Sequence, residues 1–397
     1  MKKRILAVLL AGAMVLSLAA CGIVSPESTL PGAEEPAVEE PAAEEPEAEA
    51  PEAEEPATEE ATEEEPAAEA PVDMHFEIVS KGFQHQYWQS VLKGAQDKAA
   101  ELGVTIEFVG PNTESDIADQ VQMFNNAINK QPAAIGLAAL DTQALLDAIQ
   151  ASKDAGIPII GFDSGVPDAP EGAVLANCST DNYAAGELAA EHAYPAIKDR
   201  VAAGGVRIGV VGQDATAESI IQRGLGFIDK VAALIEADGK TVAIEGNDKY
   251  VGDSKVEAGS AADVIIEVRV PAQVSSELLA TEAATLLNKD DIIAVFGSNA
   301  PAAEGLVTAN ENINKLGDAE DQVIGIGFDS GTAVNTAVAD GVLFGAVTQA
   351  PVAMGEWLVD LLYKAANGEA VSDIDTGAQW YDASNIENPE ISQNLYD

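Results

Sequence analysis

From residue 74 onward, short apolar runs alternate with longer stretches of helical periodicity. The run His75–Ser80 predicts a strand, and Tyr87–Leu102 predicts a helix that ends before Gly103, a residue suited to a helix C-terminus. Strands are also expected at residues 104–109, 134–137 and 158–162, and helices at 115–130 and 143–155. Strands and helices alternating in this way predict βαβ units and a parallel sheet.

The alternation begins again at residue 206. Strands are expected at residues 206–211, 292–296 and 323–328, and helices at 217–237, 281–288, 301–312 and 352–366. Two such series predict an α/β fold of two doubly wound parallel-sheet lobes.

The N-terminal residues indicate export. Basic residues 2–4 precede the apolar run Ile5–Leu18, which is short for a membrane span and typical of a secretory signal peptide. The following Leu18-Ala19-Ala20-Cys21 resembles the bacterial lipobox, which implies that Cys21 is lipidated and anchors the chain to the outer face of the cell membrane. An ordinary signal peptide with an incidental cysteine is the alternative. Cys178 is then a lone thiol, expected in the core.

Residues 22–71 are strongly acidic. They contain 18 Glu and neither Lys nor Arg, interspersed with Pro and Ala. Repelling charges and prolines predict a disordered linker between membrane and folded body, with an acidic interaction tail as the alternative. The formal net charge of the chain is −47, which argues against a nucleic-acid partner, because such binding needs a basic surface.

A five-residue motif, Gly-Phe-Asp-Ser-Gly, occurs at residues 161–165 and again at 327–331. Each copy follows a predicted buried strand, so Asp163 and Asp329 are expected at carboxyl ends of parallel strands, where open α/β sheets bind ligands. One carboxylate from each lobe would then face a shared cleft and accept hydrogen bonds from sugar hydroxyls. The alternative is that each Asp only caps the following helix.

Together these motifs resemble the type I periplasmic binding proteins of ABC sugar importers, in the ribose/allose/galactose-binding group, over about residues 74–370. Further support comes from segments 83–88, 180–186, 222–227, 296–299 and 347–351. In the family, the first of these segments supplies a polar residue and two aromatics that sandwich a sugar ring. The resemblance implies ligand contacts from His85, Tyr87, Trp88, Asp163, Arg223, Asn299, Asp329 and Gln349, and also from Gln273.

The chain departs from the family pattern at several positions. Ser164 follows Asp163 where the family often has Arg, and Ala138 stands where the family has a ligand-binding Asn, for which Asp141 is a candidate replacement. Residues 249–271 look inserted. Two alternatives stay open within the site: Trp88 as a core residue of its helix, and Arg223 in a surface salt bridge.

The resemblance implies two lobes joined by a hinge that closes around ligand. We expect a signal peptide at 1–21, a linker at 22–71, an N-terminal lobe from 72–180 plus about 350–377, and a C-terminal lobe from 181–349 plus about 378–397. The implied partners are a small sugar and the permease and ATPase subunits of an importer, with a monomer as the family default and no cofactor or metal. Which sugar is bound, or whether the ligand is a sugar at all, stays open, and so does a role in presenting ligand to a sensor kinase or chemoreceptor.

Two other classes of protein fit less well. The three histidines, at 75, 85 and 192, have no metal-ligand spacing, and no nucleophile elbow or phosphate-binding loop is present, so we do not expect an enzyme. A glycosidase would use paired carboxylates, but no other glycosidase feature is visible. A sugar-responsive repressor would need a basic helix-turn-helix where this chain has a signal peptide and an acidic segment.

Overall fold

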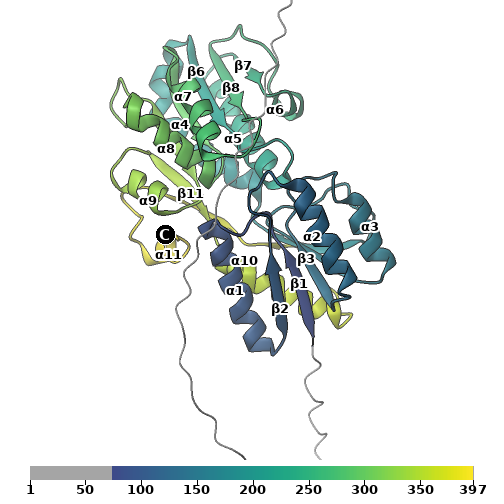
Figure 1. The fold of residues 1–397 in the computed structure, drawn as a ribbon. Helices are drawn as coiled ribbons and strands as arrows, with labels where there is room; N and C mark the ends of the chain where they lie inside the picture. The colour runs from purple at the N-terminus through teal and green to yellow at the C-terminus, as the bar shows by residue number, and fades with distance from the viewer. Residues whose placement is uncertain (1–73, 397) are drawn as a thin grey trace, which may run out of the picture. The chain divides into compact units, whose positions relative to one another are not determined.

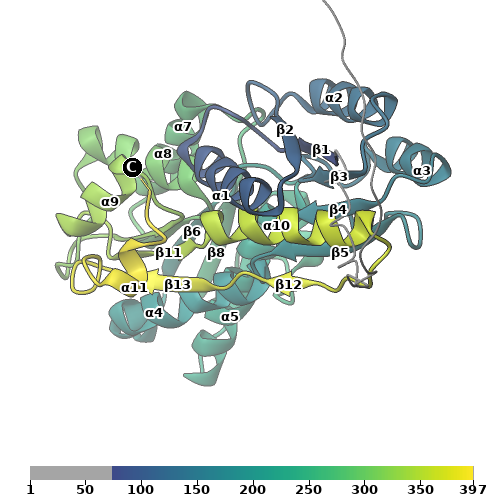
Figure 2. The same ribbon diagram turned by 90° about the horizontal axis from the view of Figure 1, so that it is seen from below.

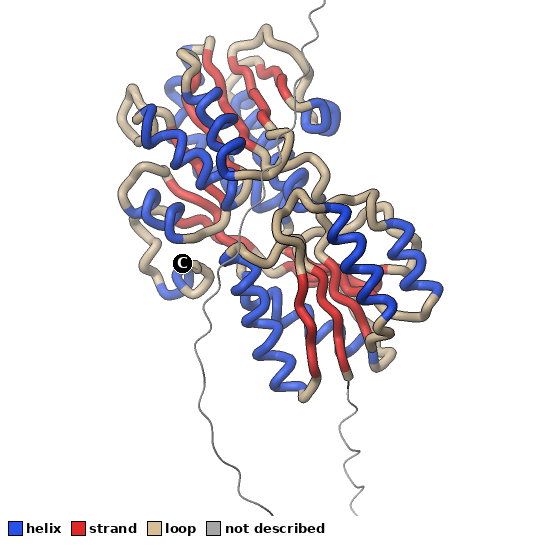
Figure 3. Tube along the Cα trace, viewed as in Figure 1, coloured by secondary structure: helices blue, strands red, loops and turns tan. Residues whose placement is uncertain are grey.

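In the computed structural model, residues 74–396 are described, and they contain two β-sheets flanked by helices (Figures 1 and 3). The α/β fold with two parallel-sheet lobes is therefore confirmed. The expected signal peptide, the lipidation site at Cys21 and the acidic linker lie outside the described residues.

The sheet of the first lobe has the strand order β12-β5-β4-β3-β1-β2, and every neighbouring pair is parallel. Its faces are covered by different helices because successive residues of a strand point to opposite sides. Ile78 packs with α1 and α10, whereas the next residue, Val79, packs with α2 and α3. The elements are β1 (His75–Val79), α1 (Gln86–Leu102), β2 (Thr105–Val109), α2 (Ile117–Asn129), β3 (Ala134–Leu137), α3 (Leu146–Asp154), β4 (Ile159–Phe162), β5 (Val174–Ser179), α10 (Pro351–Ala366) and β12 (Ile374–Asp375).

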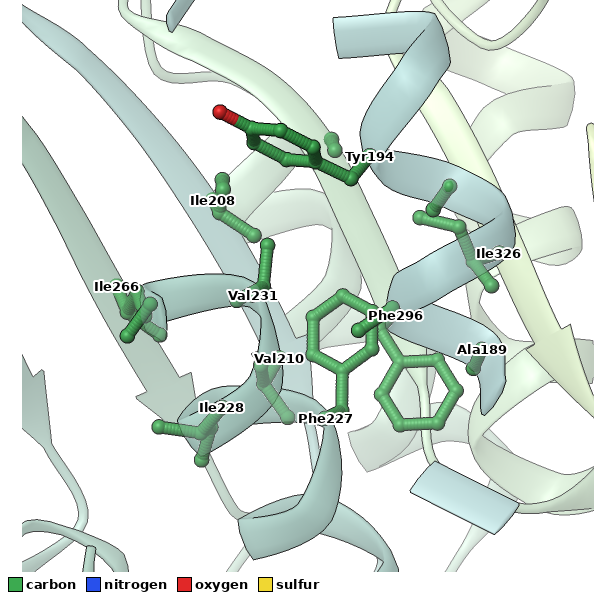
Figure 4. Packing of buried hydrophobic residues seen from close by; sticks show 14 of the residues in the cluster. Ala189, Tyr194, Ile208, Val210, Phe227, Ile228, Val231, Ile266, Phe296 and Ile326 are labelled. Carbon is green, nitrogen blue, oxygen red and sulfur yellow. The ribbon is translucent and has the colours of Figure 1, made fainter. Parts of the chain in front are cut away.

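The second sheet has the order β13-β11-β10-β9-β6-β8-β7 and is parallel except for β13, which runs antiparallel to β11. Helices α4 and α5 cover one face, where the rings of Phe227 and Phe296 stack with centroids 4.4 Å apart (Figure 4). Helices α7, α8 and α9 cover the other face. The elements are α4 (Asn182–Ala203), β6 (Val206–Val211), α5 (Glu218–Ala237), β7 (Val242–Gly246), α6 (Asp248–Asp253), β8 (Val264–Arg269), α7 (Ser276–Leu287), β9 (Ile292–Gly297), α8 (Ala300–Ile313), β10 (Ile324–Phe328), α9 (Thr332–Ala339), β11 (Gly345–Gln349), β13 (Ala378–Tyr381) and α11 (Pro389–Ser392).

Both lobes contain helices that are in backbone contact through glycine. A Cβ atom on Gly355 of α10 would lie 2.0 Å from the carbonyl oxygen of Val91 in α1, and the two helices run side by side in Figures 1 and 2. Similarly, a Cβ atom on Gly226 of α5 would lie 2.0 Å from the carbonyl oxygen of Tyr183 in α4. Such distances are far inside van der Waals contact, so only glycine allows these helices to approach so closely.

The chain passes between the two sheets three times, at residues 179–182, 349–351 and 375–378. The first and third crossings are hydrogen-bonded to each other: the Thr180 hydroxyl donates to the carbonyl of Gly377 (3.2 Å), and the amide of Asp181 donates to Asp375 (3.0 Å). These parallel crossings are where a hinge between the lobes would bend.

The segment that looked inserted contributes one strand to the second sheet. Residues 264–269 form β8, which pairs with β6 on one side and β7 on the other. The charged Glu267 interrupts the apolar pattern of this strand, yet its side chain is buried and lies 2.6 Å from Arg207 and 2.8 Å from Lys289. The sequence did not predict this strand, because a buried charge interrupts its apolar pattern.

Candidate functional site

The two copies of the repeated motif have the same local structure. Asp163 follows β4 and Asp329 follows β10, and both have left-handed backbones, with φ values of 55° and 69°. In each, the amide donates to a carbonyl of the adjacent strand: Asp163 to Cys178 (3.0 Å) and Asp329 to Val347 (2.7 Å). Neither side chain caps the helix that comes next in the chain, since α4 is capped by Asp181 and the residue before α9 is Gly331. Neither carboxylate is therefore directed by capping of the helix that follows it in the chain.

Asp163 lies between an aromatic hydroxyl and a buried lysine. Tyr87 donates its hydroxyl to Asp163 Oδ1 at 2.8 Å. Lys81 Nζ lies 2.9 Å from Asp163 Oδ2 and forms an ion pair with it, but the geometry is not that of a hydrogen bond. In the described part of the chain, this oxygen therefore has no hydrogen-bond donor. Lys81 is 3% exposed; burial works against its charge, but nearby carboxylates outweigh burial and raise its pKa.

Sequence reasoning missed Lys81. It stands two residues past the end of β1, the strand-end position from which ligand-binding side chains are expected in such folds. Its Nζ also donates to the hydroxyl of Ser219 in the second lobe at 3.1 Å, so it contacts both lobes.

Arg223, on α5, is buried in the second lobe beside Asp329. Its guanidinium donates to the side-chain oxygen of Asn182 (2.8 Å from Nη2) and to the carbonyl of Ser298 (3.1 Å), and it lies 3.5 Å from Asp329 Oδ2. It also stacks on the ring of Phe328, 3.7 Å from the centroid. With 2% of its surface exposed, Arg223 is not in a surface salt bridge.

The remaining polar groups of the second lobe orient one another. Gln349, at the end of β11, donates from Nε2 to Asp329 Oδ1 at 2.6 Å. Asp329 Oδ2 accepts the amide of Ala300 at the start of α8 (3.0 Å). Asn299, the N-cap of α8, accepts the amide of Ala302 at 3.2 Å. These bonds hold carboxylate and amide groups in fixed positions at the strand ends.

The expected aromatic residues come from the first turns of α1. His85 is the N-cap, with Nδ1 accepting the amide of Tyr87 at 3.2 Å. The rings of Tyr87 and Trp88 meet edge to face, with centroids 4.9 Å apart, and Trp88 donates to Glu114 Oε1 at 2.8 Å. Trp88 is 2% exposed and packs in the first-lobe core, so it is a core residue that also borders the cavity described next.

A cavity that is partly open to solvent lies between the lobes. It brings together eight of the nine expected residues. The ninth, Gln273, is exposed in the loop before α7 and does not line this cavity, because that loop faces the first lobe through Val274 instead. The lining residues are Lys81, His85, Tyr87, Trp88, Glu114, Asp163, Ile220, Arg223, Asn299, Ala300, Pro301, Asp329 and Gln349.

The departures from the family pattern have structural roles outside the cavity. Ser164 accepts the amide of Ser219 from the second lobe at 3.3 Å, so it makes an interlobe contact. Ala138 is fully buried. Asp141 accepts the amides of Gln143 and Ala144 at 2.8 Å each and does not line the cavity, so it does not replace the missing family Asn.

One group in the described part of the chain has side chains of metal-ligand type, and it lies away from the cavity. His75 Nε2 is 2.8 Å from Glu77, and the amino group of Lys130 lies 2.9 Å from Glu77 and 2.8 Å from Glu107. The lysine already compensates both carboxylates. Within residues 74–396, no helix has the length and apolar character needed to cross a membrane.

A two-lobed α/β body with a polar and aromatic cavity at opposing strand ends defines a solute-binding protein in structural terms. Residues 76–370 match the family described as periplasmic binding protein domain. Since this match covers well over half of the chain, the chain belongs to that family, which consists of solute-binding proteins and is not an enzyme family.

Several proteins are similar to this chain, and the descriptions of two of them name a sugar. The D-allose-binding periplasmic protein of Escherichia coli (strain K12) is 24% identical over 312 residues, covering 77% of this chain and 88% of that protein. An ABC transporter solute-binding protein from Agrobacterium vitis, solved with bound D-fucose, is 32% identical, with 81% and 100% of the two chains covered and a TM-score of 0.66. A structure described as an ABC transporter, LacI family transcriptional regulator, from Brachyspira murdochii is 37% identical, with 82% and 99% covered and a TM-score of 0.68.

Proposed function

We propose that this chain is the extracytoplasmic substrate-binding lipoprotein of an ABC importer, that it binds a small sugar between its lobes, and that it does so without catalysing a reaction. The observation that carries the proposal is the interlobe cavity, which combines carboxylates, a guanidinium and amides with aromatic rings. Similarity to proteins named for D-allose and solved with D-fucose supports the ligand class.

The chemistry of the cavity suits a polyhydroxylated ring. Carboxylates of Asp163 and Asp329 accept hydrogen bonds from hydroxyls, whereas Arg223 donates them. Tyr87 and Trp88 offer apolar surface to the C–H face of a sugar, which excludes water while the hydroxyl rim stays free for polar contacts. The proposed ligand contacts are His85, Tyr87, Trp88, Asp163, Arg223, Asn299, Asp329 and Gln349, to which the structure adds Lys81.

The binding mechanism is hinge closure. Asp163 and the aromatics belong to the first lobe, and Arg223, Asn299 and Asp329 to the second, so only a closed arrangement lets one ligand contact both sets. Ligand therefore shifts the population toward the closed form, which the permease subunits of the importer would recognise. A monomer is sufficient for this mechanism.

A thermal-shift panel tests the ligand class. The full chain is screened against D-allose, D-fucose, D-arabinose, other monosaccharides and polyols. A ligand at a hundredfold excess over its Kd is expected to stabilise the native state by about 2.7 kcal/mol. No stabilisation by any sugar or polyol, together with a shift by a different class of small molecule, would refute sugar binding.

The anchor is tested separately. Cys21→Ser removes the only site in the lipobox-like segment that can be acylated, and it is expected to release the protein from the membrane fraction into the soluble fraction when expressed in a lipoprotein-processing bacterium. Unchanged membrane association of Cys21→Ser would refute lipid anchoring at this residue. Sugar affinity should be the same for both forms.

A further inference from the structure

A continuous chain of hydrogen bonds crosses from one lobe to the other beside the cavity. In the first lobe, Trp88 Nε1 donates to Glu114 Oε1 at 2.8 Å. Gln213 Nε2, in the second lobe, donates to Glu114 Oε2 at 2.8 Å. Asn299 Nδ2 then donates to Gln213 Oε1 at 2.6 Å, and the amide of Ala302 donates to Asn299 Oδ1 at 3.2 Å.

The two ends of this chain fix its polarity. An indole N–H and a backbone N–H can only donate, so both Trp88 and Ala302 require an acceptor. Each Asn or Gln side chain in this series donates to one neighbour through its nitrogen and accepts from the other through its oxygen. A series of amides alone therefore cannot connect two groups that both donate. One member must accept from both sides, and Glu114, as a carboxylate, is that member.

A second contact fixes the orientation of the Gln213 amide. Its Nε2 atom also lies 3.3 Å from Asp214 Oδ2, so the nitrogen faces two carboxylates. A reversed amide would place its oxygen against both of them. Gln213 is 1% exposed and Asn299 is 5% exposed, so water cannot easily replace a lost partner, and an unpaired donor at either position would be costly.

We propose that Glu114 and Gln213 form an interlobe latch, which stabilises the closed arrangement and holds the amide of Asn299 in a single orientation at the cavity. Glu114 lies in the loop after β2, in the first lobe, and Gln213 lies in the loop after β6, in the second lobe. Their hydrogen bond therefore forms only when the two lobes are in contact. The effect of the latch on sugar affinity rests on the proposed function, whereas its effect on closure does not. Glu114 and Gln213 are positioning residues in this scheme.

The polarity argument gives a test by exchange of the two side chains. In E114Q, the introduced amide lies between two donors, Trp88 Nε1 and Gln213 Nε2. In either orientation its own NH₂ group therefore faces one of these donors. In Q213E, two carboxylates meet. In the double variant E114Q/Q213E every bond between Trp88 and Asn299 can form again, whereas the bond to Asp214 is lost. Trp88 then donates to the oxygen of the introduced amide, the nitrogen of that amide donates to the introduced carboxylate, and Asn299 donates to the other oxygen of the same carboxylate. The nearby Asp214 makes this restoration incomplete.

Closure is measured on the full chain without sugar, by hydrogen–deuterium exchange at amides that donate across the cleft. Two of these amides are followed: Val274, which donates to Ser115 Oγ at 2.7 Å, and Thr142, which donates to the carbonyl of Thr216 at 3.3 Å. We expect E114Q and Q213E each to speed exchange at both amides about tenfold or more, and the double variant to recover most of the protection. Amides in the centre of β6 serve as the internal control for global stability.

Sugar affinity is the second readout, with D-allose, D-fucose and D-arabinose as probes. Each single variant is expected to weaken binding about 10- to 100-fold, and the double variant to bind more tightly than either single variant. Unchanged exchange in E114Q, or a double variant no better protected than the worse single variant, overturns the latch. If the wild-type chain binds none of the probes but hydrogen exchange changes as expected, the proposed latch is supported and the proposed sugar binding is contradicted.

Discussion

Asp163 and Asp329 adopt the same left-handed backbone conformation, with φ values of 55° and 69°, at equivalent strand ends of the two lobes. Of the residues with side chains, Asp and Asn tolerate this conformation best. Each Asp amide donates to the neighbouring strand, so the turn is fixed by the sheet. A single pentapeptide thus directs one carboxylate from each lobe into the cavity.

The charge of Asp329 should matter more than its shape. Asp329→Asn keeps the backbone preference but weakens the interaction with Arg223 and leaves Gln349 facing an amide, so sugar affinity should fall about 10- to 100-fold. Calorimetric titration of the best ligand measures this. The matched control is Asp340→Asn, at an exposed helix end, which should bind normally. Normal binding by Asp329→Asn would place the ligand elsewhere.

Arg223 should not be replaceable by lysine. Its guanidinium donates in several directions and stacks on Phe328, which a lysine ammonium cannot reproduce. We expect Arg223→Lys to lose at least about tenfold in affinity and Arg223→Ala to lose measurable binding. Circular dichroism checks that both variants remain folded. Equal affinities for Arg223→Lys and wild type would show that only the positive charge is required.

Removing Lys81 should leave a buried carboxylate without its counter-charge. Lys81→Met is expected to lower the free energy of unfolding by about 3 kcal/mol, and adding Asp163→Asn should recover part of that loss, because the uncompensated charge is then gone. Urea denaturation of the two variants measures the difference. As a comparison, Lys93→Met removes an exposed ion pair with Asp97 and should cause no measurable change. Equal losses in single and double variants would argue against charge as the cause.

The glycine contact between α1 and α10 should tolerate no side chain. Gly355→Ala places a methyl group against the carbonyl of Val91, so the helices must separate, at a cost of about 2 kcal/mol or more in unfolding free energy. Gly252→Ala is the control, since a Cβ there meets open space within a helix, and it should be neutral or slightly stabilising. Thermal unfolding of both variants decides whether close approach, rather than glycine flexibility, is what matters.

Much of the fold and part of the site could be predicted from sequence because their signals are local. Apolar periodicity predicted most first-lobe elements, and the repeated pentapeptide marked both strand-end carboxylates. Glu114 and Gln213 carried no such signal, since their pairing exists only when the two lobes meet. Strand β8 was not predicted because the charged Glu267 interrupts its apolar pattern. The residues that compensate this charge, Arg207 and Lys289, lie far from Glu267 in the sequence. Local patterns thus reveal elements and strand ends, whereas partners across the cleft require the tertiary structure.

The three crossings between the lobes also determine the order in which the lobes can fold during synthesis. Helix α10, which packs on α1 and on the first sheet, is encoded after all of the second sheet except β13. A nascent chain that has emerged up to residue 180 therefore still lacks one of the two helices that cover one face of its sheet. Neither lobe can finish folding until α10 and β13 have been made, which would keep the polypeptide loose enough for passage through a translocation channel during most of its synthesis.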